Sequence, residues 1–200
     1  MNLHKKIFLV PFLPEVPVVE GRRMWQEEHG PIWLRTPHLR GYVQNRLIPE
    51  WWDRAPALAC AEDYFDSREA EQQMLETDYY RDQVRPDEER MFRRSGAWVS
   101  TVTEEELLRD GTRSALRVLA FGAPRPAEED LADAGRVELM HVRKAPPLCV
   151  HAHVVSAWAD DLDHAERLSR SLGGFVLVVA PEPLMAPPLA PWQASQPGVN

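Results

Sequence analysis

The order of strands and helices expected from the sequence predicts an α+β fold made of two tandem ferredoxin-like repeats. Residues 5–103 follow the order β-α-β-β-α-β, which is the ferredoxin-like arrangement. Residues 114–180 repeat that order without repeating the amino acids. The chain has 200 residues, 44% of them hydrophobic, which is enough for a buried core. We expect the first repeat over residues 1–110, a degenerate second repeat over 111–182 and a Pro-rich C-terminal tail over 183–200.

Local patterns in the first part of the chain indicate a strand, a helix and a second strand. Residues 5–10 are a short apolar run, which favours a buried strand. A helix is expected over residues 21–28, with a ragged continuation to Arg35 before the stop signal Thr36-Pro37. It should end or kink at Gly30-Pro31, because Pro31 has no N–H to donate. Residues 39–45 alternate with period two, which is typical of a strand.

The elements that follow complete the first repeat. Ser67 comes directly after a strand expected over residues 58–65, and it is a residue type that caps helix N-termini. The remaining elements are a loop over residues 47–56, helices over residues 67–76 and 79–92, and a strand over residues 96–103. On the second of these helices, Asp82, Asp87 and Glu88 are expected to form a solvated face.

The second half repeats this order in shorter pieces. The expected strands lie over residues 114–121, 136–143, 148–158 and 174–180. The expected helices lie over residues 126–134, where a proline opens the segment, and 160–172.

Composition excludes several classes of function. The formal net charge is −8, because 31 Asp and Glu outnumber 23 dispersed Lys and Arg, so nucleic acid is not an expected partner. No apolar run approaches the roughly 18–20 residues of a membrane-spanning helix, and the N-terminal apolar run lacks the features of a signal peptide. The two cysteines, Cys60 and Cys149, do not make a disulfide framework, which favours a cytoplasmic location.

Residues 25–46 hold the most informative group of side chains. Trp25 and His29 are four residues apart and share one face of the expected helix. On the strand that follows, Tyr42 and Gln44 alternate onto one polar face. Histidine suits proton transfer near neutral pH, so the segment places a candidate acid or base beside polar groups that could orient a ligand.

The same segment carries a family resemblance. Trp25-x-x-x-His29-x-Pro31-Ile32, followed by residues 37–45, resembles the EthD family of dimeric α+β barrel proteins. Further matches in the expected order are Glu62, Phe65-Asp66-Ser67 and Asp87-Glu88-x-x-x-Phe92, so the resemblance covers about residues 5 to 107. It implies ferredoxin-like sheets that close face to face into a barrel, normally by dimerisation. Here a tandem pair could close the barrel within one chain, and a further homodimer is left open.

The resemblance implies a cofactor-independent enzyme that performs proton transfer on an aromatic or polyketide-like substrate. The first hypothesis is a lyase or isomerase that decarboxylates, dehydrates or cyclises this substrate. His29 and Glu62 are its expected acid and base, and the expected substrate-binding residues are Trp25, Tyr42, Gln44, Asn45 and Tyr64. Two alternatives are a cofactor-free monooxygenase of the same superfamily and a non-catalytic ligand-binding accessory protein.

The second half offers a metal site as a competing interpretation. Cys149, His151 and His153 alternate on one face of an expected strand, and a turn at residues 145–147 would place His141 roughly opposite His151. These are ligand types that zinc prefers. Side chains on a flat strand face are nearly parallel, however, and do not converge on one point. We therefore expect no metal and no cofactor, with a small molecule as the partner.

Overall fold

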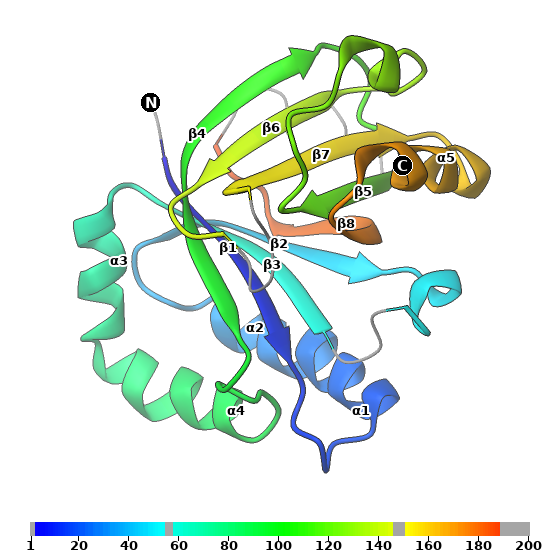
Figure 1. Ribbon diagram of the computed structural model, residues 1–200. Coiled ribbons are helices and arrows are strands. Elements are labelled where there is room, and N and C mark those ends of the chain that lie inside the picture. The colour runs from blue at the N-terminus through cyan, green and yellow to red at the C-terminus, as the bar shows by residue number, and fades with distance from the viewer. Residues whose placement is uncertain (1–2, 55–57, 146–150, 189–200) are drawn as a thin grey trace, which may run out of the picture. The chain divides into compact units, whose positions relative to one another are not determined.

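The computed structural model describes residues 3–54, 58–145 and 151–188 (Figure 1). Its strands are β1 (His4–Pro11), β2 (Leu39–Leu47), β3 (Leu58–Phe65), β4 (Trp98–Arg109), β5 (Leu116–Phe121), β6 (Val137–Val142), β7 (His153–Ala159) and β8 (Phe175–Met185). Its α-helices are α1 (Val18–Arg23), α2 (Gly30–Trp33), α3 (Arg68–Leu75), α4 (Arg85–Glu89) and α5 (Leu162–Leu172). The other helical elements are two π-helical segments, η1 (Met24–His29) and η3 (Tyr80–Val84), and two 3₁₀ turns, η2 (Pro49–Trp51) and η4 (Glu128–Leu131).

The predicted fold class of two tandem ferredoxin-like repeats is wrong. The strands form one closed barrel in the order β1-β3-β2-β8-β5-β7-β6-β4. Between β5 and β6, where the repeat requires an α-helix, the chain has only the short turn η4. Pro124 and Pro126 precede that turn, and proline cannot continue a helical hydrogen-bond ladder. Period-two patterns predicted where strands lie, but they do not specify which strands pair.

The chain divides into two compact units. Unit 1 comprises residues 1–45, 56–99 and 182–200, and unit 2 comprises residues 46–55 and 100–181. Both units are discontinuous in sequence. The domain boundaries expected from the sequence, at residues 110 and 182, stay a prediction.

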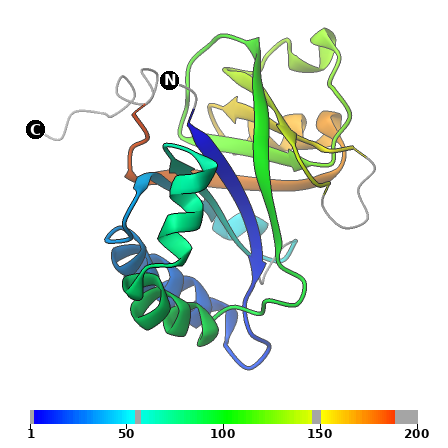
Figure 2. The ribbon, with the colours of Figure 1, turned by 90° about the vertical axis from the view of Figure 1, so that its left-hand side faces the viewer.

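In unit 1 the strand β3 lies between β1 and β2 and is antiparallel to both. The helices of this unit lie on one side of β1 and β3 (Figure 2). The expected cap of α3 is confirmed, because the Ser67 hydroxyl accepts a hydrogen bond of 3.2 Å from the backbone N–H of Ala70. Two apolar clusters fix the helices to the strands, one around Trp33 and Phe65 and the other around Phe12 and Trp25.

Unit 2 is built on β5 and β7, which pair antiparallel. The strand β6 joins β7 to β4, and β8 pairs with β5 on its other edge. Helix α5 contacts both β5 and β7. Its N-cap is Asp161, whose carboxylate accepts from the backbone N–H of His164 at 2.8 Å. In the described parts of the chain, no helix is long and apolar enough to cross a membrane.

Candidate functional site

A cavity of about 350 Å³ lies in unit 1 against the face of β1, β2 and β3 that carries the helices. Its apolar wall includes Phe8, Val10, Ala59 and Ala61 from the strands. Its other wall comes from the helical segments, and the side chains there are Trp25, His29, Trp33, Tyr80, Arg85, Glu88 and Phe92. Asp63 and Tyr42 complete the strand face. The cavity thus combines an apolar, aromatic body with a few polar groups, as small-molecule sites do.

Two π-helical segments place the polar groups of the helical wall. η1 ends at His29 and is followed by Gly30-Pro31, and η3 ends at Val84 and is followed by Arg85-Pro86. Each proline stands near the start of the next α-helical piece, where the missing N–H removes little of the ladder. At Gly30, where the sequence predicts an end or a kink, the π-helical segment changes to an α-helix, which continues to Trp33. Such π segments occur frequently at functional sites.

His29 is held by a hydrogen bond from across the unit. Its Nδ1 lies 2.7 Å from Oδ2 of Asp87, and the residue is only 5% exposed. Arg90 donates two hydrogen bonds to the other carboxylate oxygen of Asp87, at 2.8 and 2.6 Å. Burial raises the pKa of Asp87, but the hydrogen bonds from His29 and Arg90 outweigh it and lower that pKa below its usual value. An ionised Asp87 only accepts, so Nδ1 carries the proton and Nε2 is left for a ligand.

Aromatic rings fix the orientation of the His29 imidazole. The ring of Trp33 stacks on it at 5.8 Å between centroids, and the ring of Phe92 meets it edge-on at 5.6 Å. Both aromatic residues also line the cavity. A ring that is packed on two sides and bonded at one nitrogen has little freedom to rotate, which is the preorganisation that proton transfer requires.

Asp63 and Tyr42 stand directly opposite each other on β3 and β2. Asp63 is 2% exposed, and its Oδ1 accepts a hydrogen bond of 3.0 Å from the indole N–H of Trp33. Burial raises the pKa of Asp63 well above its usual value. Burial also raises the pKa of Tyr42. Burial therefore favours the neutral, protonated form of both groups.

Gln44 lies beside Tyr42 and fixes it. Its Nε2 donates to the hydroxyl oxygen of Tyr42 at 3.1 Å and to the backbone carbonyl of Trp25 at 3.0 Å. Both N–H bonds of the amide are thus used, and Gln44 itself is fully buried. Gln44 supports the cavity wall and does not line it.

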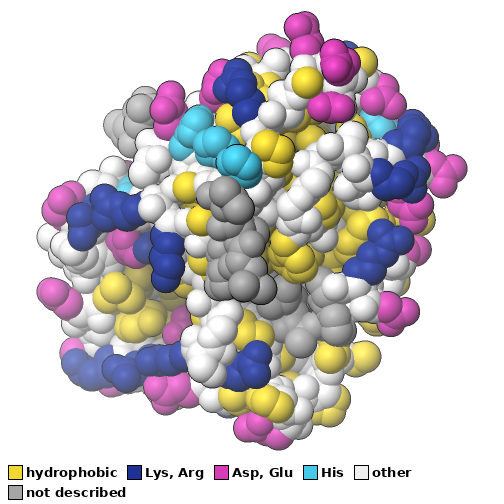
Figure 3. Space-filling view, viewed as in Figure 1, with side chains coloured by type: hydrophobic (Ala, Val, Ile, Leu, Met, Phe, Trp, Pro, Cys, Tyr) yellow, Lys and Arg dark blue, Asp and Glu magenta, His cyan; other side chains and the backbone are white. Residues whose placement is uncertain are grey.

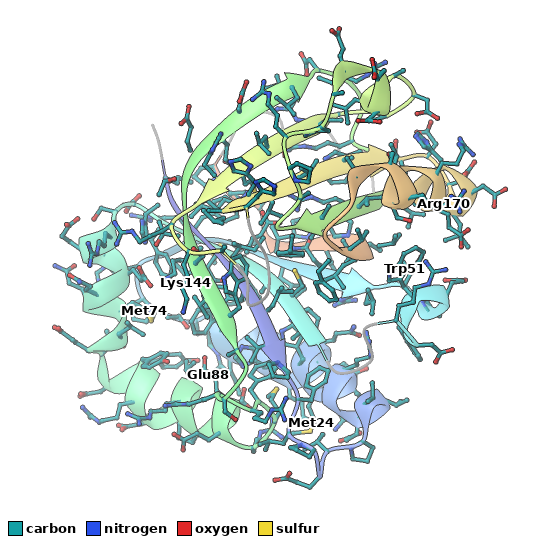
Figure 4. The ribbon with its side chains drawn as sticks, in the orientation of Figure 1. Met24, Trp51, Met74, Glu88, Lys144 and Arg170 are labelled. Atoms are coloured by element: carbon teal, nitrogen blue, oxygen red, sulfur yellow. The ribbon has the colours of Figure 1, made fainter. Side chains whose placement is uncertain are left out.

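Glu88 is a second carboxyl group on the cavity, from α4 (labelled in Figure 4). Burial raises its pKa above the usual value. The hydroxyl of Tyr80 donates to it at 3.3 Å, and burial raises the pKa of Tyr80 to about 12. Arg85 and Arg94 also line the cavity, and both bond to Glu89.

The structure brings together only some of the residues expected from the sequence. Trp25, His29 and Tyr42 line one cavity. Glu62, the expected partner of His29, lies on the opposite face of β3 from the cavity, because successive side chains of a strand point to opposite faces and Asp63 faces the cavity. Asn45 and Tyr64 bond to Glu62 and lie with it. His29 and Glu62 are therefore not an acid–base pair.

Glu62 instead belongs to a buried polar cluster. It is 0% exposed and lies 2.8 Å from the ammonium of Lys5. The hydroxyl of Tyr64 donates to it at 2.9 Å, and the amide of Asn45 donates at 3.0 Å. A buried carboxylate that is paired and hydrogen-bonded in this way is a structural element of the core.

Sequence reasoning missed three carboxyl groups of the site. Asp87 and Glu88 were expected on a solvated helical face with Asp82, yet only Asp82 is exposed, whereas Asp87 is buried and Glu88 is half-buried. The motif match at Asp87-Glu88 could have signalled them. Asp63 gave no signal of its own, since only the pairing of β2 with β3 sets it beside Tyr42.

Figure 3 shows histidine side chains gathered on one face of the molecule. In unit 2, His141 pairs across the strands with His153 and not with His151 as expected, and their ring centroids are 4.8 Å apart. Burial and the neighbouring His141 and His151 lower the pKa of His153. Over residues 3–54, 58–145 and 151–188, no group of three His, Cys, Asp or Glu side chains is placed to hold a metal. Cys149, the fourth expected ligand, lies outside the described residues.

Residues 14–95 match the family model of the EthD domain. The resemblance expected for the first half of the chain is thereby confirmed. The match spans the helical wall of the cavity and both strands that carry Tyr42 and Asp63. No curated protein sequence matches the chain.

Several solved structures resemble the chain at very low sequence identity, and one of them has a TM-score above 0.5. A candidate monooxygenase from Fusobacterium nucleatum subsp. nucleatum superimposes with a TM-score of 0.52 at 6% identity, over 91% of this chain and 92% of that one. A candidate monooxygenase from Lactobacillus acidophilus NCFM gives a TM-score of 0.48 at 10% identity, over 90% and 94% of the two chains. An anthrone oxidase-like protein gives 0.48 at 11% identity, over 92% and 94%. At such identities the likeness concerns the fold alone.

Proposed function

We propose that the chain is a cofactor-independent enzyme that oxygenates a small aromatic, polyketide-like substrate after removing a proton from it. The observation that carries this proposal is the geometry at His29. Its Nδ1 is held by Asp87 at 2.7 Å, and the ring lines a cavity of about 350 Å³. That volume falls within the roughly 300–1,000 Å³ of small-molecule sites.

The first step is abstraction of a C–H proton by Nε2 of His29. The resulting imidazolium is stabilised by Asp87, whose pKa is low enough for it to stay ionised. The substrate becomes a carbanion, conjugated with an adjacent carbonyl group. Trp25, Trp33 and Phe92 supply flat apolar surfaces against which an aromatic substrate stacks.

The second step is reaction of the substrate carbanion with molecular oxygen. A CH₂ group becomes a carbonyl group, one oxygen atom enters the product and the other leaves as water. Two similarities support oxygenation over the lyase reaction first expected from the sequence. They are the EthD match and the fold shared with the candidate monooxygenase from Fusobacterium.

A second candidate is a lyase or isomerase, and Asp63 is the observation that favours it. Asp63 is buried in the cavity wall, and its raised pKa favours the protonated form, so it could return a proton to the carbanion before oxygen reacts. Both candidates share the step at His29. They differ in whether the carbanion is oxidised or protonated again.

Oxygen uptake separates the two candidates. The purified protein is incubated with aromatic ketones that carry an acidic C–H, in air and under nitrogen, in D₂O. Oxygenation predicts one O₂ consumed per product and no turnover under nitrogen. Deuterium incorporation without O₂ uptake would establish the lyase or isomerase. Binding of the ketones without any product, unchanged in His29→Ala, would instead establish a ligand-binding protein.

A further inference from the structure

The hydroxyl of Tyr42 is directed by its neighbours. Its oxygen accepts a hydrogen bond from Gln44 at 3.1 Å. Within the described ranges, no acceptor for the proton of Tyr42 is found. Tyr42 is 1% exposed and lines the cavity. Its O–H is therefore available to a ligand inside the cavity.

The carboxyl group of Asp63 is directed in a similar way. Its Oδ1 is occupied by the indole N–H of Trp33 at 3.0 Å. No Lys or Arg of the described segments bonds to it, and burial raises its pKa well above the usual value, which favours the protonated form. The proton on its second oxygen finds no protein acceptor among the residues described, so it too is available to a ligand in the cavity.

Strand pairing brings these two donors together. Tyr42 and Asp63 are paired residues of β2 and β3 and share the cavity face. Directly paired residues have Cβ atoms about 4.5–5.5 Å apart. Two O–H groups at that separation can point at a single oxygen atom of a ligand, and neither has a negative charge to repel it.

We propose that Tyr42 and Asp63 form an oxyanion hole, and that the substrate is an aromatic ketone or phenol whose oxygen sits between them. The inference rests on the proposed function for the identity of the reaction. When Nε2 of His29 takes the C–H proton, the electron pair of that bond forms a C=C bond, and the carbonyl π electrons move to oxygen. The two O–H groups stabilise the enolate oxygen at that moment. A carboxyl group kept neutral so that it can donate is an established device for enolate chemistry.

The test uses para-nitrophenol, whose anion absorbs visible light, as a mimic of the enolate. Binding to the whole protein at neutral pH is followed by absorbance, which reports both affinity and the charge of the bound ligand. We expect the anion to be the bound form. Tyr42→Phe should weaken its binding by roughly ten- to a hundredfold, because a hydrogen bond to a charged oxygen is lost. Asp63→Asn should weaken it less, because the amide N–H₂ of asparagine can still donate to the anion.

Two variants serve as matched controls. Tyr79→Phe also removes a tyrosine hydroxyl, one that already donates to the backbone carbonyl of Ile32 at 2.8 Å. Asp66→Asn makes the same change as Asp63→Asn at an exposed position that bonds Arg40. Neither control residue lines the cavity, so both should bind the phenolate as the unsubstituted protein does.

Raising the pH provides a second measurement that needs no variant. As Asp63 ionises, its charge should expel the anion, and affinity should fall although more ligand is ionised. Binding of the neutral phenol alone, or equal affinity in the Tyr42→Phe variant and the unsubstituted protein, would overturn the oxyanion hole. The same titration in His29→Ala separates this inference from the proposed function. If the His29→Ala variant still binds the phenolate but the unsubstituted protein turns over no ketone, the oxyanion hole is supported and the proposed reaction is contradicted.

Discussion

Replacing Asp63 with asparagine should make the stability of the protein less dependent on pH. The pKa of Asp63 is raised in the folded state by burial, whereas an unfolded Asp titrates near 3.9, roughly. A group with a raised folded pKa stabilises the fold fully below its unfolded pKa, and this contribution is lost as pH rises toward the folded pKa. The free energy of unfolding of the unsubstituted protein should therefore fall above about pH 4. The asparagine of the variant has nothing to ionise, and its amide oxygen can still accept from Trp33.

The size of the effect follows from the burial of Asp63. At 2% exposure the side chain is not screened by solvent, so no discount applies. Between the unfolded and folded pKa values, each pH unit costs the unsubstituted protein about 1.4 kcal/mol relative to the Asn variant. Over two pH units the difference between the two proteins should change by up to about 2.7 kcal/mol. That is a large share of the roughly 5–15 kcal/mol that holds a typical domain folded.

Other charged groups near Asp63 titrate in both proteins. Glu88 faces the same cavity, and the Lys6–Glu71 pair, 2.8 Å between charged atoms, lies on the neighbouring β1 and α3. Their titration cancels when the two proteins are compared at each pH. Their coupling to Asp63 does not cancel. Glu88 and Glu71 raise the pKa of Asp63 and act in the same direction as burial, whereas Lys6 lowers it.

Urea unfolding followed by tryptophan fluorescence at pH 5, 6 and 7 measures the difference. At each increase in pH, the free energy of unfolding of the Asn variant should rise relative to that of the unsubstituted protein, with an unchanged denaturant slope. Asp66→Asn, an exposed control, should show no such trend. Parallel stability curves for Asp63→Asn and the unsubstituted protein would refute the reasoning, because they would mean that Asp63 is ionised in the folded state.

Further expected outcomes concern the base, the buried ion pair and metals. His29→Ala should abolish turnover while circular dichroism shows folding nearly intact. Asp87→Asn should lower kcat by roughly 10²–10⁴ with ligand affinity unchanged, because the imidazole loses the carboxylate that orients it. Full activity in either variant would contradict the catalytic role. Glu62→Gln should destabilise the fold by about 3–5 kcal/mol in urea unfolding, because Lys5 loses its buried counter-charge, and unchanged stability would show the pair to be solvated. Purified protein should be metal-free by elemental analysis and active in a chelator, whereas stoichiometric zinc lost together with activity would move the active site to unit 2.

The sequence by itself determined the local features of unit 1. A short apolar run located β1, period-two alternation located β2, and the hydroxyl of Ser67 marked the start of α3. The four-residue spacing of Trp25 and His29 put both on one helical face, and both line the cavity. These features depend on interactions between residues close in the chain, which periodicity and capping preferences capture.

Tertiary structure alone decided the chemistry of the site. Alternation along β3 states that Glu62 and Asp63 face opposite ways, but only the packing of the helices decides that Asp63 faces the cavity. His29 meets Asp87 across 58 residues of sequence, and no local pattern carries a contact of that separation. The closure of eight strands into one barrel is likewise a matter of which edges pair. Pairing is chosen by the burial and hydrogen bonding of the whole sheet, which no single segment of the sequence encodes.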